Sequence, residues 1–262
     1  MRSLYLYLDH RTWVHRLHPV VRVWGMAAFF ITAFLVERPA AQVPVLALLV
    51  ALVVWTGSLP NIRRLRVLLS LIFIMTFLIW TFFYGPDGQA PLLTVAGLVV
   101  SRTAPWFALG MAIKLSVIVA AGILFLSVTR IEELAYALNC LGLPYKIGFT
   151  MSLAFRLVPV FLDAANTVVQ AQRCRGLDFD RGHVGQRLLR YIPVIIPVFM
   201  GALRRADGMA MALEARGFQS NRPRTTLQQY RFGAIDAAAM LGLSGMAAAY
   251  VILWWTGALK LR

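Results

Sequence analysis

The sequence contains little charge, few acidic residues and almost no cysteine. Only 14% of its 262 residues are charged and 60% are hydrophobic, whereas about a quarter of the residues in a soluble domain carry charge. This composition excludes an ordinary soluble fold and predicts a polytopic membrane protein. The two cysteines, Cys140 and Cys174, are too few for a disulfide framework and have no metal-binding spacing.

The motifs of common membrane enzymes and of ATP hydrolysis are also missing. The sequence has no HExxH, no GxSxG, no paired Asp-rich motif inside an apolar run and no Walker A loop. We therefore expect no catalytic residues and no cofactor, and we expect any ATP hydrolysis to occur in a partner. His10, His15 and His18 lie close together, but their spacing suits one helical face poorly, so we expect no metal site.

The charge that is present has one dominant sign, with 26 Lys and Arg against 11 Asp and Glu. In a chain this apolar, the excess favours a membrane-orientation signal over nucleic-acid binding, because cytoplasmic loops of membrane proteins are rich in Lys and Arg. We predict a multi-pass protein with its N-terminus in the cytoplasm. The apolar runs predict about five transmembrane helices, at 20–36, 43–56, 67–84, 105–128 and 232–255.

The predicted fold is an all-α integral membrane protein in three parts. Residues 1–128 form an N-terminal membrane domain of about four spans, 129–231 form a cytoplasmic-side region, and 232–262 form the C-terminal transmembrane helix. Thr129 is expected to be the N-cap of a short helix that opens the middle part. Lys114 lies inside the fourth span, where it should face protein or water, either by snorkelling to the interface or in a functional role.

Two long helical patterns, at about 145–175 and 186–216, are assigned to the cytoplasmic side, although each is apolar enough to cross a membrane. If the first one crossed, the linker after it would carry five arginines on the outer side, against the positive-inside tendency. Helices that lie along or below the inner leaflet expose more apolar surface than solvent tolerates, so we expect an apolar partner to cover them.

Each long pattern carries one distinctive stripe. In the first, Arg156, Pro159 and Asp163 belong to a polar stripe at helical period. We expect Arg156 and Asp163 to form a structural polar pair and Pro159 to kink the helix. In the second, Gly201 and Gly208 belong to a stripe of small residues. Because small residues let helix backbones approach closely, we expect the two long helices to cross there.

Both long patterns end in an arginine followed by a glycine, and the two ends read Cys174-Arg175-Gly176 and Ala215-Arg216-Gly217. Glycine takes the left-handed turn that closes a helix at little steric cost, and the preceding arginine lies where the helix dipole favours a cation. Each helix therefore presents a guanidinium at a defined tip. Ordinary helix termination is the alternative, but two such ends in one membrane protein favour a shared role.

With these ends, the chain resembles the transmembrane coupling (T) component of energy-coupling factor (ECF) transporters, in the family that includes the cobalt-transport and biotin-transport permease subunits. The resemblance extends along almost the whole chain. Cys174 departs from it, because alanine is usual there, but a small residue is kept. The matching segments, in family order, are 9–19, 141–144, 155–159, 171–176 and 215–218.

The resemblance implies a coupling mechanism in the plasma membrane of a prokaryote. Two long crossed helices would dock into two cytoplasmic ABC-type ATPases, with Arg175 and Arg216 as the docking arginines, one for each ATPase subunit. Their apolar surfaces would carry a separate hydrophobic S component that binds the substrate. Specificity for a vitamin, a metal ion or a similar micronutrient would then belong to the S component.

A stand-alone carrier or channel for a small solute is the alternative function. Such a protein needs polar groups inside its spans. Of the charged residues, only Lys114 is expected to lie there. A carrier purified alone should move solute, whereas a coupling subunit should not.

Overall fold

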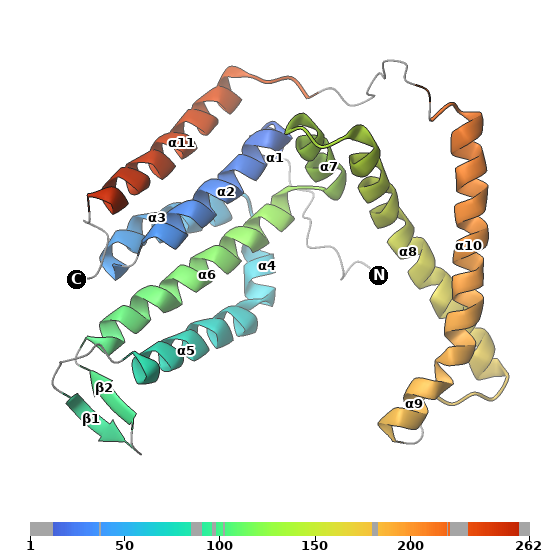
Figure 1. The fold of residues 1–262 in the computed structure, drawn as a ribbon, viewed down its shortest axis with the longest axis horizontal. Coiled ribbons are helices and arrows are strands. Elements are labelled where there is room, and N and C mark those ends of the chain that lie inside the picture. Colours follow the sequence, from blue (N-terminus) through green and yellow to red (C-terminus); the bar gives the residue numbers. More distant parts are fainter. Residues whose placement is uncertain are drawn as a thin grey trace. The chain divides into compact units, whose positions relative to one another are not determined.

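Figure 1 shows the computed structural model of the protein, which describes residues 13–36, 38–84, 91–95, 98–101, 103–179, 183–218, 220 and 230–256. The part of the predicted N-terminal segment that precedes Trp13, including His10, lies outside these residues. The elements in chain order are α1 (Trp13–Arg16), α2 (Pro19–Leu35), α3 (Pro39–Trp55), α4 (Leu59–Arg64), α5 (Arg66–Phe83), β1 (Pro91–Val95), β2 (Leu98–Ser101), α6 (Ala104–Val128), α7 (Ile131–Cys140), α8 (Tyr145–Cys174), α9 (Val184–Arg190), α10 (Ile192–Ala215) and α11 (Ala234–Trp255).

The chain forms two compact units. The first contains residues 1–143 and 230–262, and the second contains residues 144–229. The second unit is therefore an insertion in the first, between α7 and α11. A short antiparallel hairpin of β1 and β2 follows α5 in the first unit.

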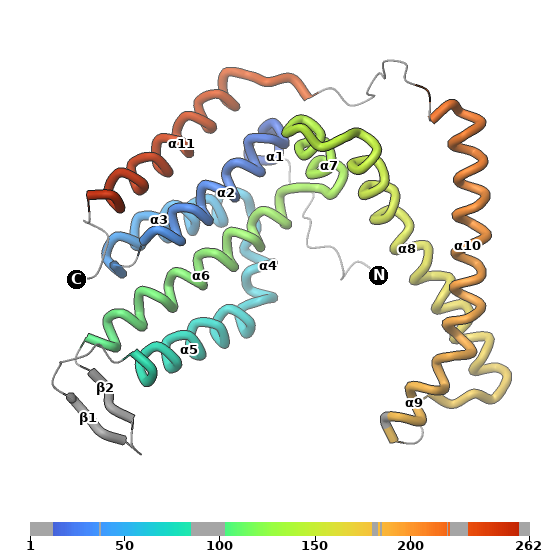
Figure 2. Tube along the Cα trace, in the orientation of Figure 1, coloured from blue at the N-terminus to red at the C-terminus, as the bar shows by residue number. Residues whose placement is uncertain are grey.

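The first unit is built around α6. In Figure 2, α11, α2, α6 and α5 lie in that order as a row, and the row corresponds to direct packing of each helix on the next. Because lipid tails are as apolar as leucine, helices in a membrane associate through close packing rather than through escape from water. The small residues Ala112, Ala120 and Ala121 are buried along α6, where α2 and α3 pack on it.

The other faces of these helices are apolar and exposed, as a lipid environment requires. By length and hydropathy, five helices in the described part of the chain could cross a membrane: α5, α6, α8, residues 185–215 and α11. The predicted all-α membrane fold is thereby confirmed. This set differs from the five predicted spans, because α2 and α3 have only 17 residues each and because hydropathy takes no account of where the arginines fall.

Lys114 has a structural partner at the end of α2. Its Nζ donates to the carbonyl oxygen of Phe34 at 2.5 Å and lies 4.8 Å from the centre of the Phe34 ring. The last carbonyl groups of a helix have no partner inside the helix and carry the negative end of its dipole, so a cation there is favourable. Lys114 therefore caps α2.

In the second unit, α8 and α10 pack on each other with opposite chain directions (Figure 2). The predicted helix at 186–216 is two helices, because the chain breaks at Tyr191. Pro193 lies in the first turn of α10, where its missing N–H costs nothing, whereas in the middle of a continuous helix it would remove a hydrogen bond. By contrast, α8 runs on through Pro159.

Candidate functional site

The C-terminal tip of α8 is closed by a left-handed glycine. Gly176 has a φ of +86°, and its N–H donates to the carbonyl of Arg173 at 3.0 Å. The next N–H, of Leu177, donates to the carbonyl of Gln172 at 3.0 Å. This pair of bonds is the Schellman motif, which satisfies the last carbonyl groups of the helix. Arg175, the residue before the glycine, is exposed, as is Cys174.

The C-terminal tip of α10 repeats this arrangement. Gly217 has a φ of +70°, and its N–H donates to the carbonyl of Glu214 at 2.8 Å. The N–H of Phe218 donates to the carbonyl of Leu213 at 2.9 Å. Arg216 and Ala215 are exposed. The two Arg-Gly signatures are thus the same structural motif with the arginine at the same place.

The backbone closure alone does not distinguish these tips. Gly57 and Gly142 also have positive φ values and end α3 and α7 with the same two hydrogen bonds. The residue before the glycine at these ends is Thr56 or Leu141 rather than arginine. The helix ending is therefore general, and the exposed guanidinium is the feature particular to α8 and α10.

The two tips lie at opposite ends of the second unit. Near the end of α8, the buried ring of Phe179 lies 5.1 Å from that of Tyr191, which precedes α10. At the other end, Phe218 lies 4.6 Å from Phe149, in the first turns of α8. Because α10 has 24 residues at about 1.5 Å each, the tips are separated by roughly 36 Å.

Aromatic packing holds each tip, but the arginine directly before each glycine has no partner among the described residues. The guanidinium of Arg173 lies 6.0 Å from the centre of the Phe179 ring, and Phe218 also approaches Tyr145 at 6.4 Å. Neither Arg175 nor Arg216 has an ion pair or a side-chain hydrogen bond with any residue that the structure describes. An arginine held in this way has its five N–H donors available for a carboxylate on another protein.

Replacing Gly217 with alanine should destabilise the α10 tip by about 1–2 kcal/mol, because a side chain is strained in the left-handed conformation. The matched control is Gly208→Ala in the same helix, where nothing lies within 4 Å of the added Cβ. That change should instead stabilise by up to about 1 kcal/mol through helix propensity. Thermal unfolding of the two purified variants would test this, and equal shifts would contradict it.

Gly201 and Gly208 do not make the predicted close helix crossing. Both are exposed, and a Cβ at either position would meet nothing within 4 Å. Within this chain, α10 instead meets α8 near its N-terminus, where Val194 is buried and Gln172 Nε2 donates to the carbonyl of Pro193 at 3.4 Å. The small-residue stripe faces outward because the aromatic contacts at both ends of α10 fix its rotation.

The predicted pair of Arg156 and Asp163 is also absent among the described residues. Both side chains are exposed. Seven residues of helix rise about 10.5 Å, which is beyond the reach of an ion pair. The two charges lie on one stripe without touching.

A second group of polar residues, of which His18, Arg22 and Asp236 are buried and the others partly exposed, lies in the first unit, and we call it the hub cluster. Its members come from the start of α2, from α7 and from the start of α11. It consists of His18, Arg22, Glu133, Tyr136, Tyr230 and Asp236.

Arg22 is the charged centre of the hub cluster. Its Nη1 pairs with Glu133 Oε2 at 2.6 Å, and its side chain is only 4% exposed. Nη1 also donates to the carbonyl of Val128, Nη2 donates to the carbonyl groups of His15 and Leu17, and Nε donates to that of Leu17. A buried charge persists only when it is paired and hydrogen-bonded in this way.

His18 joins the N-terminus of α2 to α11. Its backbone N–H donates to Asp236 Oδ1 at 2.6 Å, and Asp236 Oδ2 accepts from the N–H of Gly233 at 2.9 Å. The imidazole ring contacts the rings of Tyr136 and Tyr230, which lie 4.8 Å from each other. The cluster thereby fastens α7 and the segment before α11 to the same end of α2.

The sequence analysis missed the hub cluster. Arg22 and Asp236 both fall inside predicted spans, so Lys114 is not the only charged residue there. The sequence did offer a signal for this cluster: acidic and basic residues lie at the ends of apolar segments, where charged side chains usually pair with one another. Thr129 is also not an N-cap. Helix α7 starts after Arg130, and the backbone N–H of Arg130 donates to Glu133 Oε2 at 3.0 Å.

The hub cluster should lose stability at high pH. Burial, and secondly the Glu133 carboxylate, raise the pKa of Tyr230 above its ordinary value of 10.0, and burial also raises the pKa of Tyr136. Because the unfolded pKa is the lower one, this stabilisation is complete below about pH 10 and is lost as the pH rises through the raised pKa. Thermal unfolding against pH should show this loss, and Tyr230→Phe should reduce it. An unchanged fall in that variant would contradict the assignment.

Comparison with known proteins gives consistent matches along the chain. The CbiQ family, described as cobalt transport protein, matches residues 10–227. An energy-coupling factor transporter transmembrane protein EcfT from Ruminiclostridium cellulolyticum is 29% identical over 263 residues, covering 94% of each chain. The protein of the same name from Staphylococcus aureus is 26% identical over 262 residues, covering 96% of each.

A third relative is much longer than this chain. A putative ABC transporter ATP-binding protein, BL0043, from Bifidobacterium longum is 30% identical over 243 residues. The match covers 87% of this chain but only 30% of that protein. Most of the relative's length therefore lies outside the match.

Proposed function

The chain belongs to the cobalt transport protein (CbiQ) family and is related along its length to the transmembrane (T) proteins of ECF transporters, and from this premise we propose that it couples two ABC-type ATPases to a substrate-binding S component. ATP hydrolysis takes place in the ATPases on the cytoplasmic side. Their movement displaces the tips of α8 and α10, and the second unit passes this movement to the S component, which then releases a micronutrient inward.

The pair of arginine-capped tips carries this proposal. Arg175 and Arg216 are exposed, have no partner among the described residues, and stand at opposite ends of one antiparallel helix pair. Two separate sites at this spacing suit two similar partner subunits better than one small ligand. Arginine is also among the residues most often found at the energetic centre of protein interfaces.

The exposed apolar residues of α10 support an S component that covers them. They include Ile195, Ile196 and Phe199, each more than half exposed. The small-residue stripe with Gly201 and Gly208 is open in this chain, so a partner helix can approach its backbone closely. Surface of this extent on a helix pair needs either lipid or protein against it.

The relative from Bifidobacterium longum supports the ATPase partners. That protein is named as ATP-binding, and a minor part of its length matches this chain. The present sequence has no Walker A loop. We therefore assign ATP hydrolysis to separate subunits and expect no enzymatic activity from this chain itself.

The charge distribution supports an orientation with the N-terminus and the second unit on the cytoplasmic side of the plasma membrane. Most Lys and Arg residues then lie on that side, as is usual for short loops. The two arginine tips are thereby accessible to cytoplasmic proteins.

Purification of the full-length chain from its native membrane in a mild detergent tests the proposal. Mass spectrometry should find ABC-type ATPases and a small hydrophobic membrane protein with it, and the latter would reveal the substrate. Recovery of the chain alone, together with solute transport in liposomes, would instead support a stand-alone carrier. The capping role of Lys114 argues against that outcome, because it removes a charged residue from any transport path.

A further inference from the structure

Three arginines lie close together in the chain where α4 meets α5. They are Arg63, Arg64 and Arg66, and all three are exposed. None has an ion pair or a side-chain hydrogen bond with any residue that the structure describes. We call this group the arginine corner. It presents three positive charges, within four residues of chain, to whatever adjoins the first unit here.

The position of the arginine corner is fixed by a buried hydrogen bond. Asn61 of α4 is only 7% exposed, and its Nδ2 donates to Ser127 Oγ at 2.7 Å. Ser127 is the last residue but one of α6. Figure 1 shows α4 as the short connection between α3 and α5 in the first unit. The inward face of α4 is thus attached to the end of α6, and its arginines are left outside.

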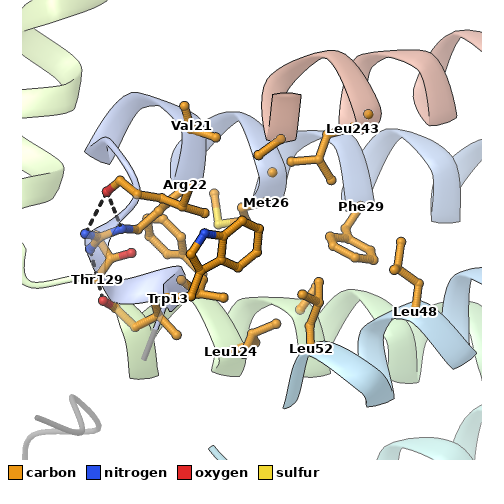
Figure 3. A pocket seen from close by; sticks show the side chains of 18 of the residues that line it. Trp13, Val21, Arg22, Met26, Phe29, Leu48, Leu52, Leu124, Thr129 and Leu243 are labelled. Carbon is orange, nitrogen blue, oxygen red and sulfur yellow. Dashed lines mark hydrogen bonds between the residues drawn. The ribbon is translucent and has the colours of Figure 1, made fainter. Parts of the chain in front are cut away.

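This end of α6 is a boundary between apolar and polar groups. Figure 3 shows Arg22 and Thr129 together at one end of the apolar space between α2, α3 and α6, with Phe29 and Leu48 farther along it. Arg22 Nη1 donates to the carbonyl of Val128, the last residue of α6, at 3.1 Å. The arginine corner therefore lies at the level where the apolar part of the first unit ends.

Helix α5 leads from the arginine corner across an apolar layer. Its 18 residues span about 27 Å, close to the roughly 30 Å of hydrocarbon in a bilayer. Only Thr76 of this helix is buried. At its far end the rings of Tyr84 and Phe107 stack at 4.0 Å, and Trp80 lies 5.2 Å from Phe107. Aromatic residues gather at membrane interfaces, so the two ends of α5 correspond to the two surfaces of one bilayer.

We propose that the arginine corner binds the phosphate of an anionic phospholipid, whose acyl chains lie along the outer face of α5. An arginine can donate two parallel N–H bonds to a phosphate, which makes it well suited to this group. The side chains that follow are apolar and open, since Val67 is 70% exposed and Leu68 is 45% exposed. This binding site goes beyond the proposed coupling function and does not depend on it.

The surroundings of the arginine corner favour an anionic lipid over other partners. A zwitterionic headgroup would bring its own cation close to the three guanidinium groups, and like charges repel. An acidic protein could also meet these charges. However, the exposed apolar face of α5 starts directly at Arg66 and has to adjoin lipid. A phospholipid headgroup is therefore already present at this level, and it supplies phosphate and hydrocarbon in one molecule.

Native mass spectrometry of the purified full-length chain in detergent tests this site. The probes are phosphatidylglycerol and phosphatidylcholine with identical acyl chains, and the measured quantity is the affinity of the first bound lipid. Phosphatidylglycerol should bind more tightly. Replacing all three arginines of the corner with glutamine should lower its affinity at least about tenfold, since one basic residue near an anionic membrane contributes about fivefold. The affinity of phosphatidylcholine should stay the same, which shows that the variant remains folded.

The matched control removes the same charge from the second unit. Arg156, Arg204 and Arg205 are exposed and have no partner among the described residues. Their replacement with glutamine should leave the affinity for phosphatidylglycerol nearly unchanged. An equal loss in this control, or no loss in the corner variant, would overturn the proposal. Displacement of phosphatidylglycerol by an equal concentration of glycerol phosphate would also overturn it, because the site would then recognise a soluble phosphate rather than a lipid.

Discussion

Replacing both Arg175 and Arg216 with glutamate is expected to abolish recovery of ATPase subunits with the chain and to abolish uptake. The chain itself should fold normally, because neither guanidinium has an ion pair or a hydrogen bond with another described residue. Each single replacement should weaken association by at least about 2 kcal/mol, or roughly thirtyfold, since it places a carboxylate where an arginine is expected to meet acidic groups.

The matched control for this experiment is Arg204→Glu. Arg204 is exposed on α10, like Arg216, but it lies 12 residues before it, at about 18 Å along the helix. The same charge change there should leave ATPase recovery nearly intact. Normal assembly of the double Arg175 and Arg216 variant would refute the docking role. Equal losses of ATPase recovery in the three single variants, at Arg175, Arg204 and Arg216, would indicate a general electrostatic effect.

Replacing Arg22 with methionine is expected to destabilise the first unit by about 3–5 kcal/mol, the cost of leaving one charge of a buried pair without its partner. Glu133 would then be buried beside an apolar side chain, and the carbonyl groups of His15, Leu17 and Val128 would lose their donors. Thermal unfolding of the detergent-solubilised chain would measure the loss.

Two further variants make this result specific. Glu133→Gln should cost less than Arg22→Met, because the amide can still accept a hydrogen bond from the guanidinium while the backbone acceptors of Arg22 are kept. Arg64→Met removes a positive charge from an exposed position on α4 and should change the stability little. A loss for Arg64→Met as large as that for Arg22→Met would mean that charge number, not the buried pair, determines the effect.

The helical class, the membrane character and the two Arg-Gly helix ends were predictable from the sequence because they depend on local signals. Apolar runs of sufficient length indicate membrane helices, and a glycine after the last helical turn indicates a left-handed closure. Gly176 and Gly217 have the expected positive φ values. The break at Tyr191 was also within reach, since Pro193 fits the first turn of a helix better than its middle.

The hub cluster and the orientation of the small-residue stripe were not predictable in the same way. Arg22, Glu133 and Asp236 are far apart in sequence, and only the packing of α2, α7 and α11 brings them together. The stripe with Gly201 and Gly208 has the right period for a close crossing. The rotation of α10 is nevertheless fixed by contacts outside the stripe, such as that of Phe218 with Phe149.

The aromatic contact between Tyr136 and Tyr230 has a topological consequence. Tyr136 lies just before the second unit begins in the chain, Tyr230 follows directly after it ends, and their rings are 4.8 Å apart. Two residues of the first unit that flank the insertion on either side are thus neighbours in space, the arrangement that tolerates insertion and exchange of whole segments.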